Sequence, residues 1–250
     1  MKGRLLNLVS LALRGLTRLK RLFLILGLIV LSLLFLAYLL KLIEPSSDPQ
    51  NILVSNITDR QATVSWTTTK ATRGIVILSE DGNFPLLPIF TKTYKDDGEK
   101  KLSRQRFYTT HHVTAGGLNP NKRYKFLIYQ GWKKMIRGEF ATGPILSAIS
   151  APNPVYGRVI SSKKTPLVGA LIYLQAETDR KKSAVLSTIT NAEGRWNLDL
   201  GNLRTGDLKL SYKIATSSVE MVLAEGANQG RGKAFTKSGK DQPWPDIIIK

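Results

Sequence analysis

An uncharged run of 19 residues, 22–40, constrains this chain more than any other part of its sequence. A helix rises about 1.5 Å per residue, so the run spans roughly 28 Å, close to the ~30 Å hydrocarbon core of a bilayer. It is longer than the apolar part of a signal peptide, and Ala37-Tyr38-Leu39 does not fit a cleavage site. We therefore predict a retained transmembrane helix, a signal anchor, over residues 22–43.

The basic residues near this run lie on its N-terminal side. They are Lys2, Arg4, Arg14, Arg18, Lys20 and Arg21, in a stretch without any acid. On the other side, Lys41 is followed by the short polar linker 44–48 (EPSSD). Basic flanks stay in the cytoplasm, so we predict a cytoplasmic tail over 1–21 and extracellular domains after the helix. Residues 4–19 fit either an amphipathic helix on the inner leaflet or a plain positive flank.

The chain has no cysteine, which excludes disulfides, cysteine-ligated zinc and thiol nucleophiles. An exported domain without disulfides must be held by its own hydrophobic core, which is more typical of bacteria than of small eukaryotic secreted domains. The sequence thus indicates a bacterial surface protein. Of the formal net charge of +19, +12 lies from Glu44 onward, because only seven of the 37 basic residues and none of the 18 acidic ones precede it.

Short runs of alternating apolar and polar residues, separated by turn signals, fill the chain after the linker. Such a pattern is typical of β-sandwiches. The first set of expected strands is 52–58, 62–67, 74–79, an edge strand in 86–93, 107–115, 123–130 and 138–142, with a solvated charged loop at 95–106. The second set is 155–160, 166–174, 184–190, 195–198, 208–214 and 218–223, then a loose loop at 224–241 and a last strand or tail at 246–250. We predict an all-β fold of two tandem sandwiches, 49–144 and 155–250, joined by a Pro-rich linker over 145–154.

The first sandwich resembles a fibronectin type III domain. Residues 52–57 followed by Ala62-Thr63-Val64-Ser65-Trp66 are similar to the first hairpin of that family, and 118–124 (LNPNKRY) to its L-x-P-x-x-x-Y signature. His112-Val113-Thr114 before Gly117 is similar to the variant at the front of purple acid phosphatases, a non-catalytic module. The resemblance implies that Trp66, Leu118, Pro120 and Tyr124 are structural, with Trp66 in the core and the Tyr124 hydroxyl bonding to upstream backbone.

The second sandwich resembles the carboxypeptidase regulatory-like domain, which has a prealbumin-like fold. The matching residues are Val155, Gly157 and Val159, then Pro166 to Ala170, and then 190–196 (TNAEGRW), where Asn191 replaces the usual Asp and Trp196 the usual Phe or Tyr. The resemblance implies structural roles for Gly169, Ala170, Gly194 and Trp196. It points to an accessory module and not to a peptidase.

Few residues carry chemistry. His111 and His112 are the only histidines, and neighbouring strand residues point to opposite faces, so we predict a structural pair and not a shared metal site. Asp96, Asp97 and Glu99 are a candidate weak calcium cluster, although the lysines around them argue against it. The sequence suggests no Ser-His-Asp arrangement and contains neither a phosphate loop nor an H-E-x-x-H motif. We expect no enzyme and no cofactor or metal.

Two basic loops are the candidate partner sites. Their residues are Lys100, Lys101, Arg104 and Arg106 in one loop, and Trp132, Lys133, Lys134 and Arg137 in the other. They suit an anionic polymer or lipid headgroup, or else they are solvated loops, and Trp132 could stack on a sugar. We predict a non-catalytic cell-surface protein that binds or scaffolds extracellular partners. The alternatives are a carbohydrate or anionic wall-polymer binding module and an accessory subunit of a surface enzyme. Specific nucleic-acid recognition is not expected, and the oligomeric state is open.

Overall fold

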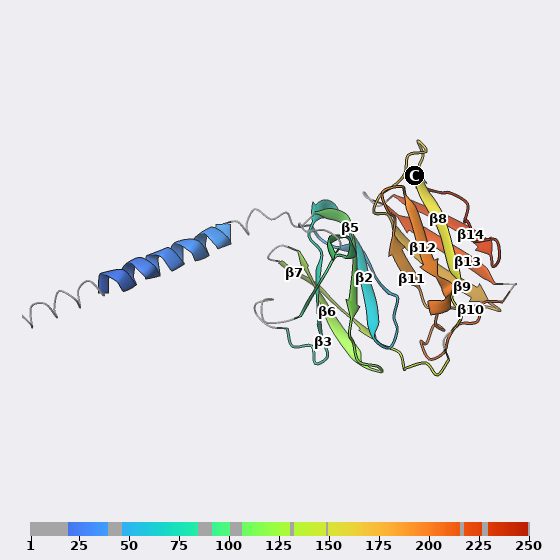
Figure 1. Cartoon of the computed structure of the whole chain (residues 1–250), viewed down its shortest axis with the longest axis horizontal. Coiled ribbons are helices and arrows are strands. Elements are labelled where there is room, and N and C mark those ends of the chain that lie inside the picture. Colours follow the sequence, from blue (N-terminus) through green and yellow to red (C-terminus); the bar gives the residue numbers. More distant parts are fainter. Residues whose placement is uncertain are drawn as a thin grey trace, which may run out of the picture. The chain divides into compact units, whose positions relative to one another are not determined.

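The computed structural model describes residues 20–39, 47–84, 92–100, 107–130, 133–148, 150–215, 218–226 and 230–249. It separates into the units Met1–Glu44 and Pro45–Lys250. The first unit contains the helix Lys20–Leu39, of 20 residues, drawn in blue in Figure 1. This helix is long and apolar enough to cross a membrane, and a signal sequence near the N-terminus would meet the same criteria. Its predicted continuation over 40–43 lies outside the described residues.

The first sandwich consists of two antiparallel sheets. One has the order β1 (Gln50–Ser55), β2 (Gln61–Thr72), β5 (Tyr108–Gly116). The other has the order β4 (Thr93–Lys95), β3 (Ile75–Ser79), β6 (Arg123–Gln130), β7 (Lys133–Ala141). The inward residues of β2, Ala62, Val64 and Trp66, pack in one core cluster with Val113 of the neighbouring strand β5 and with Val76 and Ile128 of the facing sheet. This period of two, visible in the sequence, turns the apolar face of each strand into the core. On β2 the opposite, polar face is buried as well, at Thr63, Ser65 and Thr67.

The second sandwich is drawn from yellow to red in Figure 1. One sheet has the order β10 (Lys181–Lys182), β9 (Leu171–Thr178), β13 (Val219–Glu225), β14 (Arg231–Lys237), and β11 (Leu186–Ile189) also pairs with β9. The other has the order β12 (Arg195–Asp199), β8 (Pro154–Ser161), β15 (Ile247–Ile249), with β15 parallel to β8. A 3₁₀ turn, Leu200–Asn202, follows β12.

The residues that the resemblances mark as structural take the following places. Trp66, Leu118, Tyr124, Ala170 and Trp196 are all buried, each at most 5% exposed. The Tyr124 hydroxyl accepts the Asn119 N–H at 2.9 Å and donates to Glu80 at 2.9 Å, which ties the strand to the preceding turn.

The other residues that the resemblances mark as structural lie in turns, and at Gly194 only glycine fits. Pro120 is half-buried in the turn before β6. Gly169 and Gly194 have φ of +71° and +68°, which favours glycine. At Gly194 a Cβ would also lie 2.6 Å from the Val159 carbonyl oxygen.

Three sequence predictions were wrong. Residues 208–214 form no strand: Leu208 has a φ of +65°, and a single bridge, Arg204 to Ser211, marks this segment. The expected loose loop at 224–241 contains β14, which pairs with β13 along its whole length. Its inward positions are the small residues Gly232, Ala234 and Thr236, while lysines and Phe235 face outward. With so little apolar signal, this strand is specified by its partner and not by its own composition.

The third wrong prediction is the first half of the solvated charged loop at 95–106, over residues 95–100. β4 ends at Lys95, and α2 (Asp97–Lys100) follows immediately. Asp96 and Asp97 accept hydrogen bonds from the main-chain N–H groups of His112 and Thr114 on β5, so this part is fixed to the sheet. Residues 101–106 and 85–91, with most of the expected edge strand at 86–93, lie outside the described residues.

Candidate functional site

Asn56 joins the first sandwich to the free edge of β11 in the second. Its main-chain N–H donates to the Val185 carbonyl oxygen at 2.9 Å. Its side-chain amide donates to the Ser187 carbonyl at 2.9 Å and accepts the Ser187 N–H at 2.8 Å. A carboxamide that meets both main-chain groups of one residue behaves like the neighbouring residue of an added strand. The backbone of Asn56 has a φ of +51°, a region that Asn tolerates better than most residues.

The two histidines on β5 each bond to one of two adjacent aspartates. His111 is 0% exposed, its Nδ1 lies 2.8 Å from Asp96, and its ring stacks on Trp66 at 4.7 Å. His112 Nδ1 lies 2.7 Å from Asp97. The two rings lie on opposite faces of the sheet, because neighbouring residues of a strand point in opposite directions. A Cβ at Gly74 would overlap the Asp96 carboxylate, so this site needs glycine.

Ser187, His112 and Asp97 together have the spacing of a Ser-His-Asp triad, although no motif in the sequence indicates one. His112 Nε2 lies 2.9 Å from the Ser187 Oγ, and Ser187 comes from the other sandwich. The hydroxyl, however, also lies 2.7 Å from the Ser55 Oγ and 3.0 Å from the Asn56 Nδ2. Ser187 is 4% exposed, and its N–H, a usual oxyanion donor, is already bonded to Asn56. These contacts suit a link between domains better than attack on a substrate.

Further polar contacts extend the junction on both sides of Ser187. The Tyr173 hydroxyl lies 2.9 Å from the Ser65 Oγ, and burial raises the pKa of Tyr173, which keeps this hydroxyl neutral. The Thr110 hydroxyl donates to the Gly169 carbonyl at 2.6 Å. Arg204, of which 6% of the side chain is exposed, pairs with Asp59 at 2.8 Å. The buried polar groups of the junction are thus paired with one another, as burial demands.

A cavity of about 670 Å³ lies beside this junction, and residues of both sandwiches line it. Asp97 and His112 come from the first sandwich, and Thr188, Arg195 and Trp196 from the second. The Trp196 Nε1 is buried and has no hydrogen-bond partner among the described residues. An unpaired buried N–H costs about 1–3 kcal/mol. Because this N–H is itself buried in the core beside Trp244, it does not open into the cavity, and the exposed polar side chain of this wall is Arg195.

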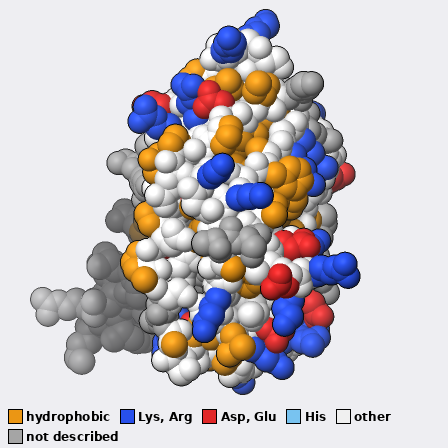
Figure 2. All heavy atoms as spheres, turned by 90° about the vertical axis from the view of Figure 1, so that its right-hand side faces the viewer, with side chains coloured by type: hydrophobic (Ala, Val, Ile, Leu, Met, Phe, Trp, Pro, Cys, Tyr) orange, Lys and Arg blue, Asp and Glu red, His pale blue; other side chains and the backbone are white. Residues whose placement is uncertain are grey.

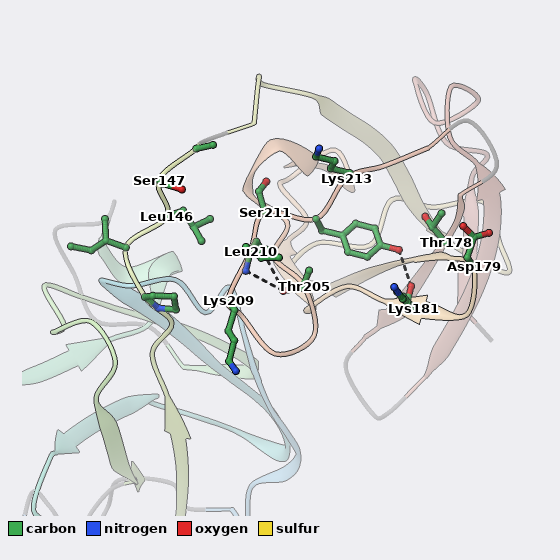
Figure 3. Close-up of a pocket in the computed structure, with 14 residues that line it drawn as sticks. Leu146, Ser147, Thr178, Asp179, Lys181, Thr205, Lys209, Leu210, Ser211 and Lys213 are labelled. Atoms are coloured by element: carbon green, nitrogen blue, oxygen red, sulfur yellow. Dashed lines mark hydrogen bonds between the residues drawn. The ribbon is translucent and has the colours of Figure 1, made fainter.

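A second cavity, of about 730 Å³, lies between the linker and the second sandwich (Figure 3). The linker residues 144–148 and the segment 205–213 line it, and Lys181, Lys209 and Lys213 reach it from two parts of the chain. Tyr212 is held across it by a 2.8 Å hydrogen bond from its hydroxyl to the Lys181 carbonyl. The described residues provide no ion-pair partner for these lysines, and the carboxylate of Asp179 also lines the groove, which therefore combines an apolar wall with three lysines and one acid.

The sequence-predicted partner residues are only partly placed. Lys101, Arg104, Arg106 and Trp132 lie outside the described residues, so their expected clustering stays a prediction. Lys100 ends α2, and Lys133, Lys134 and Arg137 lie on the edge strand β7. Within the described ranges, no group of three or more His, Cys, Asp or Glu side chains could hold a metal ion. Asp96 and Asp97 instead bond to the histidines, and Glu99 lies 4.0 Å from Arg73.

No family model matches the chain, and no curated protein matches it. Among solved structures, PhoD is 17% identical over 47% of this chain, with a TM-score of 0.30, and the chain covers 23% of PhoD, less than a quarter. The FN1–FN3 domains of chicken CNTN1 are 12% identical over 82% of this chain and 67% of that one, with a TM-score of 0.30. The central fibronectin-III array of RIM-binding protein is 14% identical over 76% and 64%, with a TM-score of 0.27. The sandwich architecture rests on the sheets described above, and these neighbours add no argument about function.

Proposed function

We propose that this chain is a non-catalytic, membrane-anchored protein of the cell surface, in which two sandwiches form one stiff arm that binds or scaffolds extracellular partners. The observation that carries this proposal is the buried hydrogen-bonded junction around Ser187. Domains within a chain move relative to each other unless their interface is extensive. Here, separating the sandwiches would break the bonds of Asn56, Tyr173 and Arg204 together.

In this proposal, the helix Lys20–Leu39 is the retained anchor. The basic residues before it keep the N-terminus in the cytoplasm and place the sandwiches outside. We further propose that the second sandwich is a carboxypeptidase regulatory-like module of a bacterial protein, on the residues around Gly157, Gly169 and Gly194. Protease added to intact cells should then digest the sandwiches and leave an epitope fused at Met1 protected. Protection of the sandwiches would refute this topology.

The absence of catalysis is testable at Ser187, because its partners block the hydroxyl. A fluorophosphonate probe, which labels activated serines, should leave the full-length protein unlabelled in detergent. Heat-denatured protein serves as the background control. If the parent protein is labelled and the label is lost in Ser187→Ala and in His112→Gln, the proposal is wrong, because Ser187 would then be a reactive nucleophile despite its hydrogen bonds.

Binding is tested with the full-length chain in nanodiscs, incubated with isolated cell-envelope fractions across a salt series. Retention of a specific envelope component is the expected result. Retention that persists at high salt indicates a sugar or protein contact, whereas retention that collapses indicates an anionic polymer or lipid. Empty nanodiscs provide the background. If no component is retained above that background, the proposed binding role is wrong.

An anionic ligand is the second candidate, and the lysine groove of Figure 3 favours it. The other basic side chains are spread widely over the face shown in Figure 2 and do not gather at one site. Replacing Lys181, Lys209 and Lys213 with Gln should weaken binding to an anionic wall polymer and flatten its salt dependence. The exposed lysines Lys163, Lys164 and Lys240, which do not line the groove, provide a control that removes the same number of charges. If the two sets of substitutions weaken binding equally, the effect is one of overall charge and the groove is not the binding site.

A further inference from the structure

We propose that the cavity beside the junction binds a short extended peptide of a partner protein through main-chain hydrogen bonds along the edges of β11 and β12. This inference rests on the proposed binding function and names the partner's chemistry. Figure 1 shows both strands on the side of the second sandwich that is turned toward β5. Added strands are a common mode of peptide recognition, because a free strand edge presents unpaired N–H and C=O groups.

The hydrogen-bond alternation of β11 directs Ile189 to the free edge. In an antiparallel ladder, successive residues turn their N–H and C=O groups to opposite sides. The Thr190 N–H bonds to Ala170 of the β9 side, and Thr188 shares its direction. Ser187 and Ile189 therefore face the other way, and Ser187 proves this by bonding to Asn56. Ile189 lines the cavity, and the described residues provide no partner for its outward groups.

The same alternation in β12 directs Asn197 to its free edge. β12 is the outer strand of its sheet, with β8 as its neighbour. The Val159 N–H bonds to the Gly194 carbonyl, so residues 196 and 198 face β8 and residue 197 faces away. Asn197 also lines the cavity, and again no described residue bonds to its main chain. Two strand edges thus present open donors and acceptors to one space.

The cavity forms because β11 and β12, which follow each other in the chain, diverge into different sheets directly after their connecting turn. The Asn191 N–H donates to the Arg195 carbonyl at 2.9 Å, which closes the turn between β11 and β12. In a continued hairpin the next hydrogen-bonded pair would be Ile189 with Asn197. Instead β11 joins the sheet of β9, and β12 joins the sheet of β8. The groups of Ile189 and Asn197 that would have bonded to each other face the cavity of about 670 Å³ that separates the strands.

The protein already uses this edge to bind an amide. Two residues before Ile189, at the preceding edge-facing position, the Asn56 carboxamide bonds to both main-chain groups of Ser187 as a peptide unit would. A partner peptide would extend that pattern along the edge by one further repeat. The remaining wall provides the exposed Arg195, which has no ion-pair partner among the described residues. Its guanidinium suits a peptide with a carboxylate or a carbonyl oxygen at that end.

The test uses full-length protein in nanodiscs and an array of N-acetylated, C-amidated octapeptides of random sequence as the probe. The best binder is then remade with a single N-methyl group at each position in turn. We expect binding to fall about five-fold or more at alternate positions, because each N-methyl removes one main-chain donor worth about 1 kcal/mol. Uniform tolerance of N-methylation, or no array peptide above the signal of empty nanodiscs, would overturn the inference.

Variants of the protein distinguish binding through main-chain hydrogen bonds from binding through side chains. Asn197→Pro and Ile189→Pro each remove one outward N–H without removing a bond of the ladder. Each should weaken the selected peptide about five-fold, whereas Asn197→Ala, which keeps the N–H, should bind it within two-fold of the parent. Far-UV circular dichroism and thermal unfolding verify that each variant folds, and having two proline variants keeps the test decisive if one does not. Equal binding by the folded proline variants and the parent would refute the site. The proline variants are also tested in the envelope-fraction assay. If a variant that no longer binds the peptide still retains the envelope component, the proposed function stands and this inference is wrong.

Discussion

Glu220 of β13 points into the second sandwich, where ionisation is costly. Its side chain is 0% exposed, and neither carboxyl oxygen meets a hydrogen-bond donor among the described residues. Burial, followed by the negative charge of Asp241, raises the pKa of Glu220 from 4.5 to about 8. At neutral pH the folded protein therefore keeps a proton on Glu220 that the unfolded chain releases.

This proton makes stability depend on pH in a defined direction. Because the folded pKa is raised, the stabilisation is complete below pH 4.5 and is lost as the pH rises through about 8. Each pKa unit corresponds to about 1.4 kcal/mol, so the shift from 4.5 to about 8 predicts a loss of at most about 5 kcal/mol. Glu220→Gln, which resembles the neutral acid, should remove this loss and become the more stable protein above pH 8.

Urea unfolding of the full-length chain in nanodiscs, followed by tryptophan fluorescence, measures the effect. The quantity that matters is the difference in unfolding free energy between the parent and Glu220→Gln at pH 5, 6.5, 8 and 9. Glu193→Gln, on an exposed turn, is the matched control and should give a difference that does not change with pH. If the Glu220→Gln difference is equally flat, the carboxyl is not protonated in the folded state and the reasoning fails.

Three further substitutions test the fold and its junction. Asn56→Ala should lower the unfolding free energy by about 2–3 kcal/mol, since it leaves the N–H and C=O of Ser187 unpaired, and should speed proteolysis between the sandwiches; an unchanged cleavage rate would contradict the junction. Gly194→Ala should cost more than about 1 kcal/mol in urea unfolding, while Gly116→Ala, whose Cβ meets nothing within 4 Å, should be near neutral; equal costs would contradict the strain argument. Tyr124→Phe should lose about 1 kcal/mol by removing the bond to the Asn119 N–H, and no change in thermal stability would show that this bond is unimportant.

Local physical chemistry made much of the fold predictable. The apolar length of the N-terminal helix, the alternation of Ala62, Val64 and Trp66, and the turn at Gly194 are properties of short segments, so they can be recognised in the sequence. The strands 123–130 and 155–160 follow the same period of two and lie within one residue of their predicted ends. β14 escaped prediction because its inward positions are small, and only its pairing with β13 makes it a strand.

Only the tertiary structure decided what the polar residues do. Asn56 and Ser187 are 131 positions apart, and His112 and Ser187 are 75 apart. A serine or an asparagine in a strand looks the same in the sequence whether its side chain faces water or another domain, because hydrophobic periodicity carries no information about polar partners. The open edges at Ile189 and Asn197 likewise arise because β11 pairs with β9 and β12 pairs with β8, and not with each other. The sequence alone specifies an apolar helix and strands with buried faces, and the docking of two sandwiches then determines which hydrogen-bonding groups are paired and which remain open for a partner.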